Sequence, residues 1–170
     1  MLSKKMSDAI NRQINAELYS AYLYLAMAAY FKDRTLDGFA QWMETQAQEE
    51  MSHAHKFYQE LFERGGRAVL DAIDKPPAEW DSAKEVFDAV YEHEKKVTAM
   101  IDDLVDLANS DNDHASQVFL QWFVSEQVEE EASAKGICDK LELVGNHPQA
   151  LLMLDRELGQ RVFNTSGGEE

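Results

Sequence analysis

The residues best suited to chemistry in this chain are glutamates and a histidine that interrupt apolar stripes. Four segments carry apolar residues in steps of three and four, a spacing that places them on one face of a helix. These stripes run from Ile10 to Phe31, from Phe39 through Met43, Gln46 and Glu50 to Phe57, from Phe87 to Ala108, and from Leu120 through Leu141 to Val144. No Lys or Arg occupies the four stripes, and an ionised, unpaired glutamate in an apolar interior would cost several kcal/mol. Bound cations are the natural compensation. The interrupting residues are Glu17, Glu50 with His53, Glu94, and Gln127 with Glu130.

This ligand set favours a pair of redox-active metal ions. Four carboxylates carry a charge of −4, which two divalent cations neutralise and one would leave half uncompensated. Oxygen ligands with one imidazole nitrogen and no sulfur favour iron or manganese over a structural zinc site. Such a pair can deliver electrons to dioxygen. Tyr24, two turns from Glu17, could hydrogen-bond a ligand or a bound oxygen species.

Four long helices must position these residues. The stripes and their flanking caps predict helices and one shorter C-terminal helix that begins at Asn146-His147-Pro148. Ser82 and Glu85 form a capping-box pattern, while Gly65-Gly66 and Gly145 end the second and fourth helices. The predicted long helices span residues 3–31, 36–64, 82–109 and 113–144.

The lengths of the connections predict the topology. Short loops near Asp33 and Ser110 make antiparallel hairpins of the first two and the last two long helices. The connection from Gly65 to Asp81 is long enough to run the roughly 40 Å length of a helix. We therefore predict an all-α four-helix bundle with a long crossover between helices two and three and a short fifth helix. The interrupting residues then fall in one layer near mid-height.

Composition sets limits on the class of protein. The 170 residues, 45% hydrophobic and 28% charged, fit one domain over residues 1–163, followed by a flexible tail at 164–170. A net charge of −16 repels nucleic acid and membrane surfaces and attracts cations. The only cysteine, Cys138, excludes an intramolecular disulfide, and the N-terminus has no secretory signal pattern. We expect a cytoplasmic protein without a membrane span.

Four local runs resemble the non-haem ferritins of bacteria and archaea, and the resemblance covers essentially the whole chain. It implies a ferritin-like four-helix bundle with a ferroxidase centre, in which Glu17, Glu50 and His53 hold the first iron and Glu50 bridges. Glu94 and Glu130 would hold the second iron, and Gln127 would line the site. The runs are Arg12-Gln13-Ile14-Asn15-Ala16-Glu17, Gln48-Glu49-Glu50-Met51-Ser52-His53, Tyr91-Glu92-His93-Glu94 and Glu126-Gln127-Val128-Glu129-Glu130-Glu131.

The resemblance also implies a third iron site and a particle. The matching carboxylates are Glu49, Glu126 and Glu129, with Glu130 shared. An acidic face in contact with water is the alternative for these residues, because charge runs on helices usually face solvent. In the family, a hollow shell of 24 identical subunits oxidises ferrous iron with dioxygen or hydrogen peroxide and stores it as a ferric mineral.

Other readings of the same residues stay open. Met51 is placed like the haem-binding methionine of bacterioferritins, but Gln127-x-x-Glu130 replaces the second Glu-x-x-His of those relatives, so no haem is expected. A discrete di-metal oxidase or peroxidase and an acidic structural bundle are the remaining alternatives. The other histidines lie off the stripes or near loops, and we expect surface or capping roles for His55, His93, His114 and His147.

Overall fold

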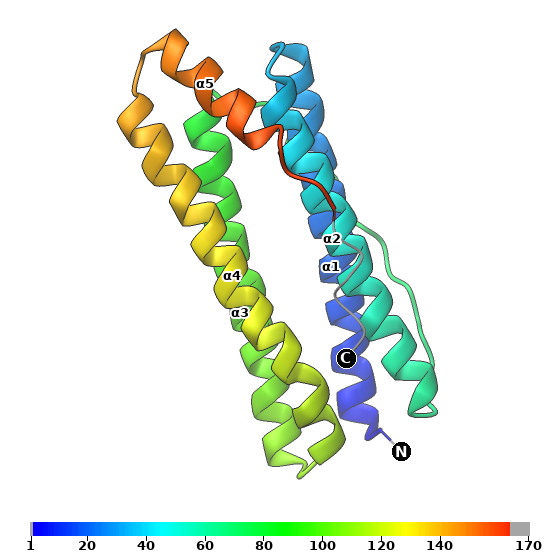
Figure 1. The fold of residues 1–170 in the computed structure, drawn as a ribbon. Coiled ribbons are helices and arrows are strands. Elements are labelled where there is room, and N and C mark those ends of the chain that lie inside the picture. The colour runs from blue at the N-terminus through cyan, green and yellow to red at the C-terminus, as the bar shows by residue number, and fades with distance from the viewer. Residues whose placement is uncertain (1, 164–170) are drawn as a thin grey trace.

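The computed structural model describes residues 2–163, which form five α-helices and no strand (Figure 1). The predicted all-α bundle with its fifth helix is confirmed, and the helix ends lie within two residues of those predicted. The proposed tail at 164–170 lies outside the described residues. No helix in the described part is both long and apolar enough to cross a membrane. The helices are α1 (Lys4–Asp33), α2 (Asp37–Glu63), α3 (Ala83–Ser110), α4 (His114–Val144) and α5 (Pro148–Leu158).

The four long helices form two packed hairpins, α1 with α2 and α3 with α4 (Figure 1). Helices α2 and α3 run in the same direction, so the crossover returns along the whole hairpin before α3 begins. Two asparagines of α1 hold the crossover. Asn11 Nδ2 donates to the carbonyl of Arg67 at 3.0 Å, and Asn15 Nδ2 donates to the carbonyl of Ala72 at 3.0 Å. The crossover is therefore fixed against the outer side of α1.

The helix starts follow the polar residues that precede them. Ser82 Oγ accepts from the backbone N–H of Glu85 at 3.1 Å, as a capping box requires. The carboxylate of Glu85, however, accepts from the N–H of Asp81 instead of Ser82. The first hydrogen bond of the predicted capping box is therefore formed, and only the return bond goes to the residue before the cap. Gly145 ends α4 with a φ of +52°, a conformation that glycine adopts without strain.

Helix α5 docks across the end of the bundle against α2 and α4 (Figure 1). The close approach depends on Gly38, where an added Cβ would lie 1.6 Å from the carbonyl oxygen of Asp155. Helix α2 has no side-chain cap of its own, and Asp155 Oδ1 accepts from the N–H of Phe39 at 3.0 Å. The side chain of Asp155, on α5, therefore caps the start of α2.

The stripes form the core, with one exception. Every stripe residue is buried except Val144, the last one, which is half-buried where α4 ends. The apolar residues make two clusters, one around Phe31 and Phe39 and the other around Phe57 and Phe123, whose stacked rings have centroids 4.1 Å apart. The polar stripe residues lie in the layer between the two clusters, where water is excluded from above and below.

Candidate metal centre

The layer brings together four carboxylates and one imidazole from all four long helices. Exposed fractions of Glu17, Glu50, Glu94 and His53 are 1–3%, and that of Glu130 is 6%. One potential ligand atom of each of Glu17, Glu50 and His53 lies within 4.8 Å of the others. The interrupted stripes predict this arrangement, in which ionisable side chains are buried together and no cationic side chain lies in the stripes.

Neutral amides hold three of the carboxylates. Gln46 Nε2 donates to Glu50 Oε1 at 2.9 Å and to Glu130 Oε2 at 2.8 Å, so one amide joins carboxylates from α2 and α4. Gln13 Nε2 donates to Glu17 Oε1 at 2.7 Å. These donors fix the carboxylate orientation without contributing a positive charge that a bound cation would have to displace.

The fourth carboxylate, Glu94, is held by a phenol and an amide. The hydroxyl of Tyr24 donates to Glu94 Oε1. Gln127 Nε2 lies 3.3 Å from Glu94 Oε2, from the Glu94 carbonyl oxygen and from Thr98 Oγ1. Gln127 therefore joins α4 to α3 at the layer, and Tyr24 contacts the layer through its hydrogen bond to Glu94.

The imidazole of His53 has a defined orientation. Its Nδ1 lies 3.2 Å from Glu50 Oε2, one turn earlier on α2. The ring packs edge-on against Trp122 and Phe123, with centroids 5.4 and 6.0 Å away. Packing on two aromatic rings and one carboxylate holds the ring beside Glu17 and Glu50.

Burial and mutual repulsion raise the pKa of the carboxyl groups. Desolvation and then the charge of Glu50 raise the pKa of Glu17 to about 8. Desolvation and then Glu94 raise the pKa of Glu130 to about 7. Burial also raises the pKa of Glu50 and of Glu94, although the donors Tyr24 and Gln127 lower that of Glu94. At neutral pH the metal-free layer consequently retains protons, which a cation would replace.

Two buried oxygen atoms of the layer have no hydrogen-bond partner among the described residues, Glu17 Oε2 and Gln46 Oε1. A buried oxygen without a donor is costly to leave in an apolar interior. A hard or borderline cation bound by oxygen and nitrogen ligands supplies the missing interaction. The donor set and the unpaired Glu17 oxygen therefore fit a metal ion.

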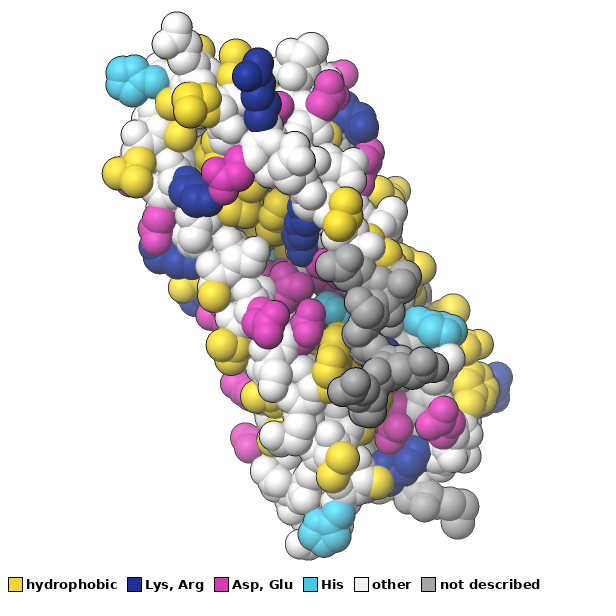
Figure 2. Space-filling view, viewed as in Figure 1, with side chains coloured by type: hydrophobic (Ala, Val, Ile, Leu, Met, Phe, Trp, Pro, Cys, Tyr) yellow, Lys and Arg dark blue, Asp and Glu magenta, His cyan; other side chains and the backbone are white. Residues whose placement is uncertain are grey.

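The carboxylates predicted for the third site lie at the rim of this layer. Glu49 and Glu126 are half-buried, and Glu129 is exposed. Desolvation by burial is the largest cause that raises the pKa of Glu49, and the charge of Glu126 adds to it. Acidic side chains gather at mid-height on one face of the bundle, beside a histidine (Figure 2).

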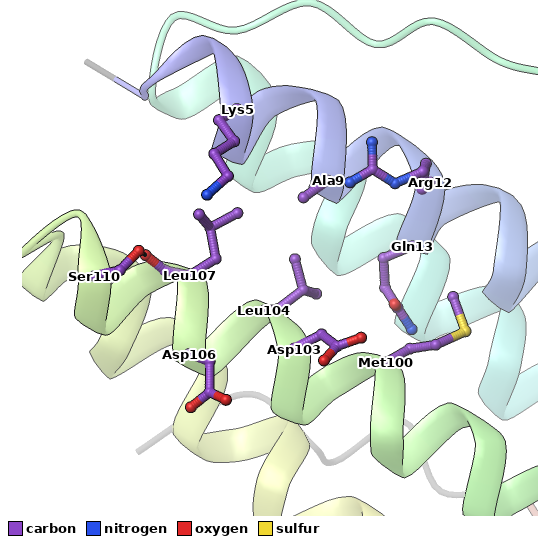
Figure 3. Close-up of a pocket in the computed structure, with 10 residues that line it drawn as sticks. All are labelled: Lys5, Ala9, Arg12, Gln13, Met100, Asp103, Leu104, Asp106, Leu107 and Ser110. Atoms are coloured by element: carbon purple, nitrogen blue, oxygen red, sulfur yellow. Dashed lines mark hydrogen bonds between the residues drawn. The ribbon is translucent and has the colours of Figure 1, made fainter.

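A pocket of about 460 Å³ lies between α1 and α3 (Figure 3). The side chain of Gln13 points into the space between the helices, with Met100 and Leu104 facing it from α3. Lys5, Arg12 and Asp103 line its outer part. Because Gln13 donates to Glu17, the pocket ends at a side chain that contacts the layer.

Three residues that contact the site carboxylates were not predicted as site residues. Gln46 has a sequence signal, since it occupies a stripe position one turn before Glu50. Gln13 stands one turn before Glu17 but off the stripe. The third, Arg161, follows α5, and its guanidinium pairs with Glu49. No periodic pattern identifies it.

The predicted surface or capping role of His93 is wrong. Its ring packs against Tyr19 and Tyr24, and its Nε2 lies 2.8 Å from Ser20 Oγ. Burial, and secondarily Lys96, lowers the pKa of this histidine to about 4. His93 therefore packs behind Tyr24 as a neutral side chain. Of the others, His55 is exposed and stacks on Tyr58.

A bundle of two helix hairpins joined by a long crossover, with carboxylates from all four helices in one buried layer, defines a ferritin-like protein. The chain belongs to this family, because the model of the ferritin-like domain matches residues 7–144. A bacterial non-haem ferritin of Bacteroides fragilis is 47% identical over 161 residues, covering 95% of this chain and 100% of the relative. A bacterial non-haem ferritin of Staphylococcus saprophyticus is 41% identical and covers 98% and 99%.

Solved structures agree. The open-pore ferritin of the hyperthermophilic archaeon Archaeoglobus fulgidus superposes with a TM-score of 0.94 at 54% sequence identity, covering 95% of this chain and 99% of that chain. A closed form of the same ferritin, engineered by mutagenesis, gives 0.95 at 54% identity and covers 96% and 100%. The resemblance to bacterial and archaeal non-haem ferritins is confirmed by these matches.

Proposed function

We propose that this chain stores and detoxifies iron by oxidising Fe(II) at a dinuclear centre within each subunit. The observation that carries the proposal is the layer of four buried carboxylates with one imidazole, held by neutral donors and keeping an unpaired oxygen on Glu17. Such a layer is electrostatically unfavourable until cations enter it. The non-haem ferritin relatives support iron as those cations.

The ligand assignment is the one that the resemblance to non-haem ferritins implies, and the clustering of three of its residues supports it. Glu17, Glu50 and His53, whose ligand atoms cluster within 4.8 Å, are proposed to bind the first iron. Glu94 and Glu130 are proposed to bind the second, with Glu50 between the two ions. Gln127 and Tyr24 line the site and orient Glu94.

The proposed reaction balances with two iron ions. Each Fe(II) loses one electron, dioxygen accepts both electrons, and two protons complete hydrogen peroxide. Hydrolysis of Fe(III) then releases further protons as the mineral grows. Peroxide serves as an alternative oxidant by accepting two electrons and yielding water. We further propose, as the resemblance to the ferritin family implies, a cytoplasmic shell of 24 subunits that encloses the mineral.

Iron stoichiometry tests the proposal. Excess Fe(II) is added in air to metal-free protein, the particle is isolated by size-exclusion chromatography with light scattering, and iron per chain is measured. Storage predicts a particle of hundreds of kilodaltons that holds iron far above three ions per chain. A small species that holds two ions or fewer would instead identify a discrete di-metal protein or a structural bundle.

Two alanine variants test the ligand assignment. Glu50→Ala and Glu130→Ala are expected to slow the rapid phase of Fe(II) oxidation while leaving the particle assembled, because each removes a proposed ligand of the layer. Glu63→Ala, at an exposed position near the end of α2, is the matched control and should oxidise iron at the wild-type rate. Wild-type kinetics in both layer variants would remove these residues from the centre.

The third site is proposed at Glu49, Glu126 and Glu129, with Glu130 shared. Glu129→Ala tests it without touching the buried layer, because Glu129 is exposed. The variant is expected to change the number of Fe(II) ions oxidised per chain and the regeneration of the centre. Unchanged stoichiometry and regeneration would identify these residues as a solvated acidic face.

A further inference from the structure

Arg161 brings a positive charge to the rim of the carboxylate layer from outside the four-helix bundle. The segment after α5 returns beside α2 (Figure 1), and Arg161 Nη2 donates to Glu49 Oε2. Both side chains of this ion pair are 22% exposed. The guanidinium also lies over the indole of Trp42, 4.3 Å from the ring centroid. Arg161 is thus held at two points, a carboxylate and an aromatic face.

The guanidinium is incompletely satisfied. Its Nη1 is buried and has no hydrogen-bond partner among the described residues. Its charge acts on two carboxylates, because it lowers the pKa of Glu49 and of Glu130 against the larger raising effect of burial. Glu130 belongs to the buried layer and Glu49 to the rim. The charge of Arg161 therefore acts on a carboxylate of the proposed dinuclear centre and on one of the proposed third site.

We propose that Arg161 is a positioning residue that occupies the cation position of the rim site, so that a third iron ion must displace its guanidinium from Glu49. The inference deepens the proposed function and rests on it. Two cations cannot share one carboxylate at the rim without repelling each other, so the ion pair lowers the affinity for the third iron. Iron bound there is consequently held weakly and exchanges readily.

The stacking on Trp42 makes this displacement reversible. A guanidinium is weakly hydrated and stacks on aromatic faces, so it can leave Glu49 and stay over the indole. The docking of α5 keeps it within reach, since Gly38 allows close contact with Asp155 and Asp155 caps α2. When the iron leaves, the guanidinium returns to Glu49 and the rim carboxylate is not left unpaired.

Anaerobic binding of Fe(II) tests the proposal. Equilibrium dialysis under argon measures the number and affinity of ions per chain on full-length, metal-free protein. Arg161→Gln is expected to tighten the weakest-bound iron by roughly tenfold, the change that corresponds to about 1.4 kcal/mol. Arg156→Gln is the matched control, because it removes the same charge from an exposed position on α5. It should bind iron as the wild type does.

A double-mutant cycle shows whether the effect passes through Glu49. In the Glu49→Gln background, Arg161→Gln is expected to change the affinity much less than in the wild type, because only its weaker effect on Glu130 remains to be removed. Arg161→Met keeps an unbranched side chain that can cover Trp42, and should tighten binding as Arg161→Gln does even if the amide variant assembles poorly. Arg161→Lys, which keeps the charge, should stay near the wild-type affinity.

The outcomes separate the inference from the proposed function. Wild-type protein that binds two or more Fe(II) ions, with unchanged affinity in both neutral variants, overturns the role of Arg161 and leaves the ferroxidase proposal standing. Equal tightening in Arg156→Gln attributes the effect to net charge and also overturns it. Wild-type protein that binds no Fe(II) contradicts the function itself.

Discussion

The buried carboxyl of Glu17 should make cation uptake a proton-releasing reaction. With a pKa of about 8, this group is mostly protonated at pH 6.5 and mostly ionised at pH 8.5. Glu130, with a pKa of about 7, also loses its proton between these two pH values. Cation binding requires both carboxylates to be ionised. The two groups together should therefore release between one and two protons per chain at pH 6.5 and fewer than one at pH 8.5.

Calorimetry and infrared spectroscopy measure this release. Titration of metal-free protein with Zn(II), a redox-inert probe, in buffers of different ionisation enthalpy gives the protons released per chain. The carbonyl stretch of protonated carboxyl groups reports the same protons before metal is added. In Glu17→Gln this band should lose the contribution of one carboxyl at pH 6.5 and little at pH 8.5. Glu63→Gln, at an exposed position, is the control and should keep the band.

The reasoning fails on two results. Absence of the protonated-carboxyl band in metal-free wild type at pH 6.5 would mean that burial does not hold protons on the layer. A band that is the same in wild type and Glu17→Gln would place the proton elsewhere. Either result would refute the raised pKa assigned to Glu17, and with it the predicted pH dependence of proton release.

Three further predictions follow from the same contacts. Because burial raises the pKa of Glu17 from 4.5 to about 8, the folded state holds a proton that the unfolded state loses. The contribution of this group to stability is full below pH 4.5 and is lost as the pH rises toward 8, by about 4 kcal/mol. Calorimetry of metal-free wild type and Glu17→Gln at pH 5 and 8 would detect it, and the same pH dependence in both proteins would contradict it. Gln46→Leu removes the amide that donates to both Glu50 and Glu130, and should weaken anaerobic Fe(II) binding by about tenfold or more. Binding at the wild-type affinity would show that the amide is dispensable. Tyr24→Phe removes the hydroxyl that donates to Glu94, and should lower the free energy of unfolding by about 1–3 kcal/mol in a denaturant titration. An unchanged free energy of unfolding would show that water replaces the phenol.

The stripes predicted the layer because residues spaced by three and four must lie on one face of a helix. Residues at that spacing share one helix face, so Glu17 and Glu94 had to face the same interior once the loop lengths had fixed the hairpins. The same reasoning located Gln127 and Glu130 at the same height. The one failure along the stripes, the half-buried Val144, comes where α4 ends and its neighbours no longer cover it.

The residues around the layer were harder to predict because their positions depend on packing between elements. Gln13 stands off the stripe, and its contact with Glu17 follows from a side-chain rotamer that periodicity does not specify. His93 lies beside a stripe position, and only the packing of Tyr19 and Tyr24 buries it. Arg161 reaches Glu49 across 112 residues of sequence, through the docking direction of α5.

The cap that α5 supplies to α2 has a consequence for the order of folding. The N–H of Phe39 is satisfied by Asp155, a residue 116 positions later in the chain. During synthesis the hairpin of α1 and α2 emerges long before Asp155, so the start of α2 stays frayed until the last helix arrives. Docking of α5 then completes α2 and brings Arg161 to the rim in one step. Closure of the bundle end and completion of the site surroundings therefore depend on the same C-terminal helix.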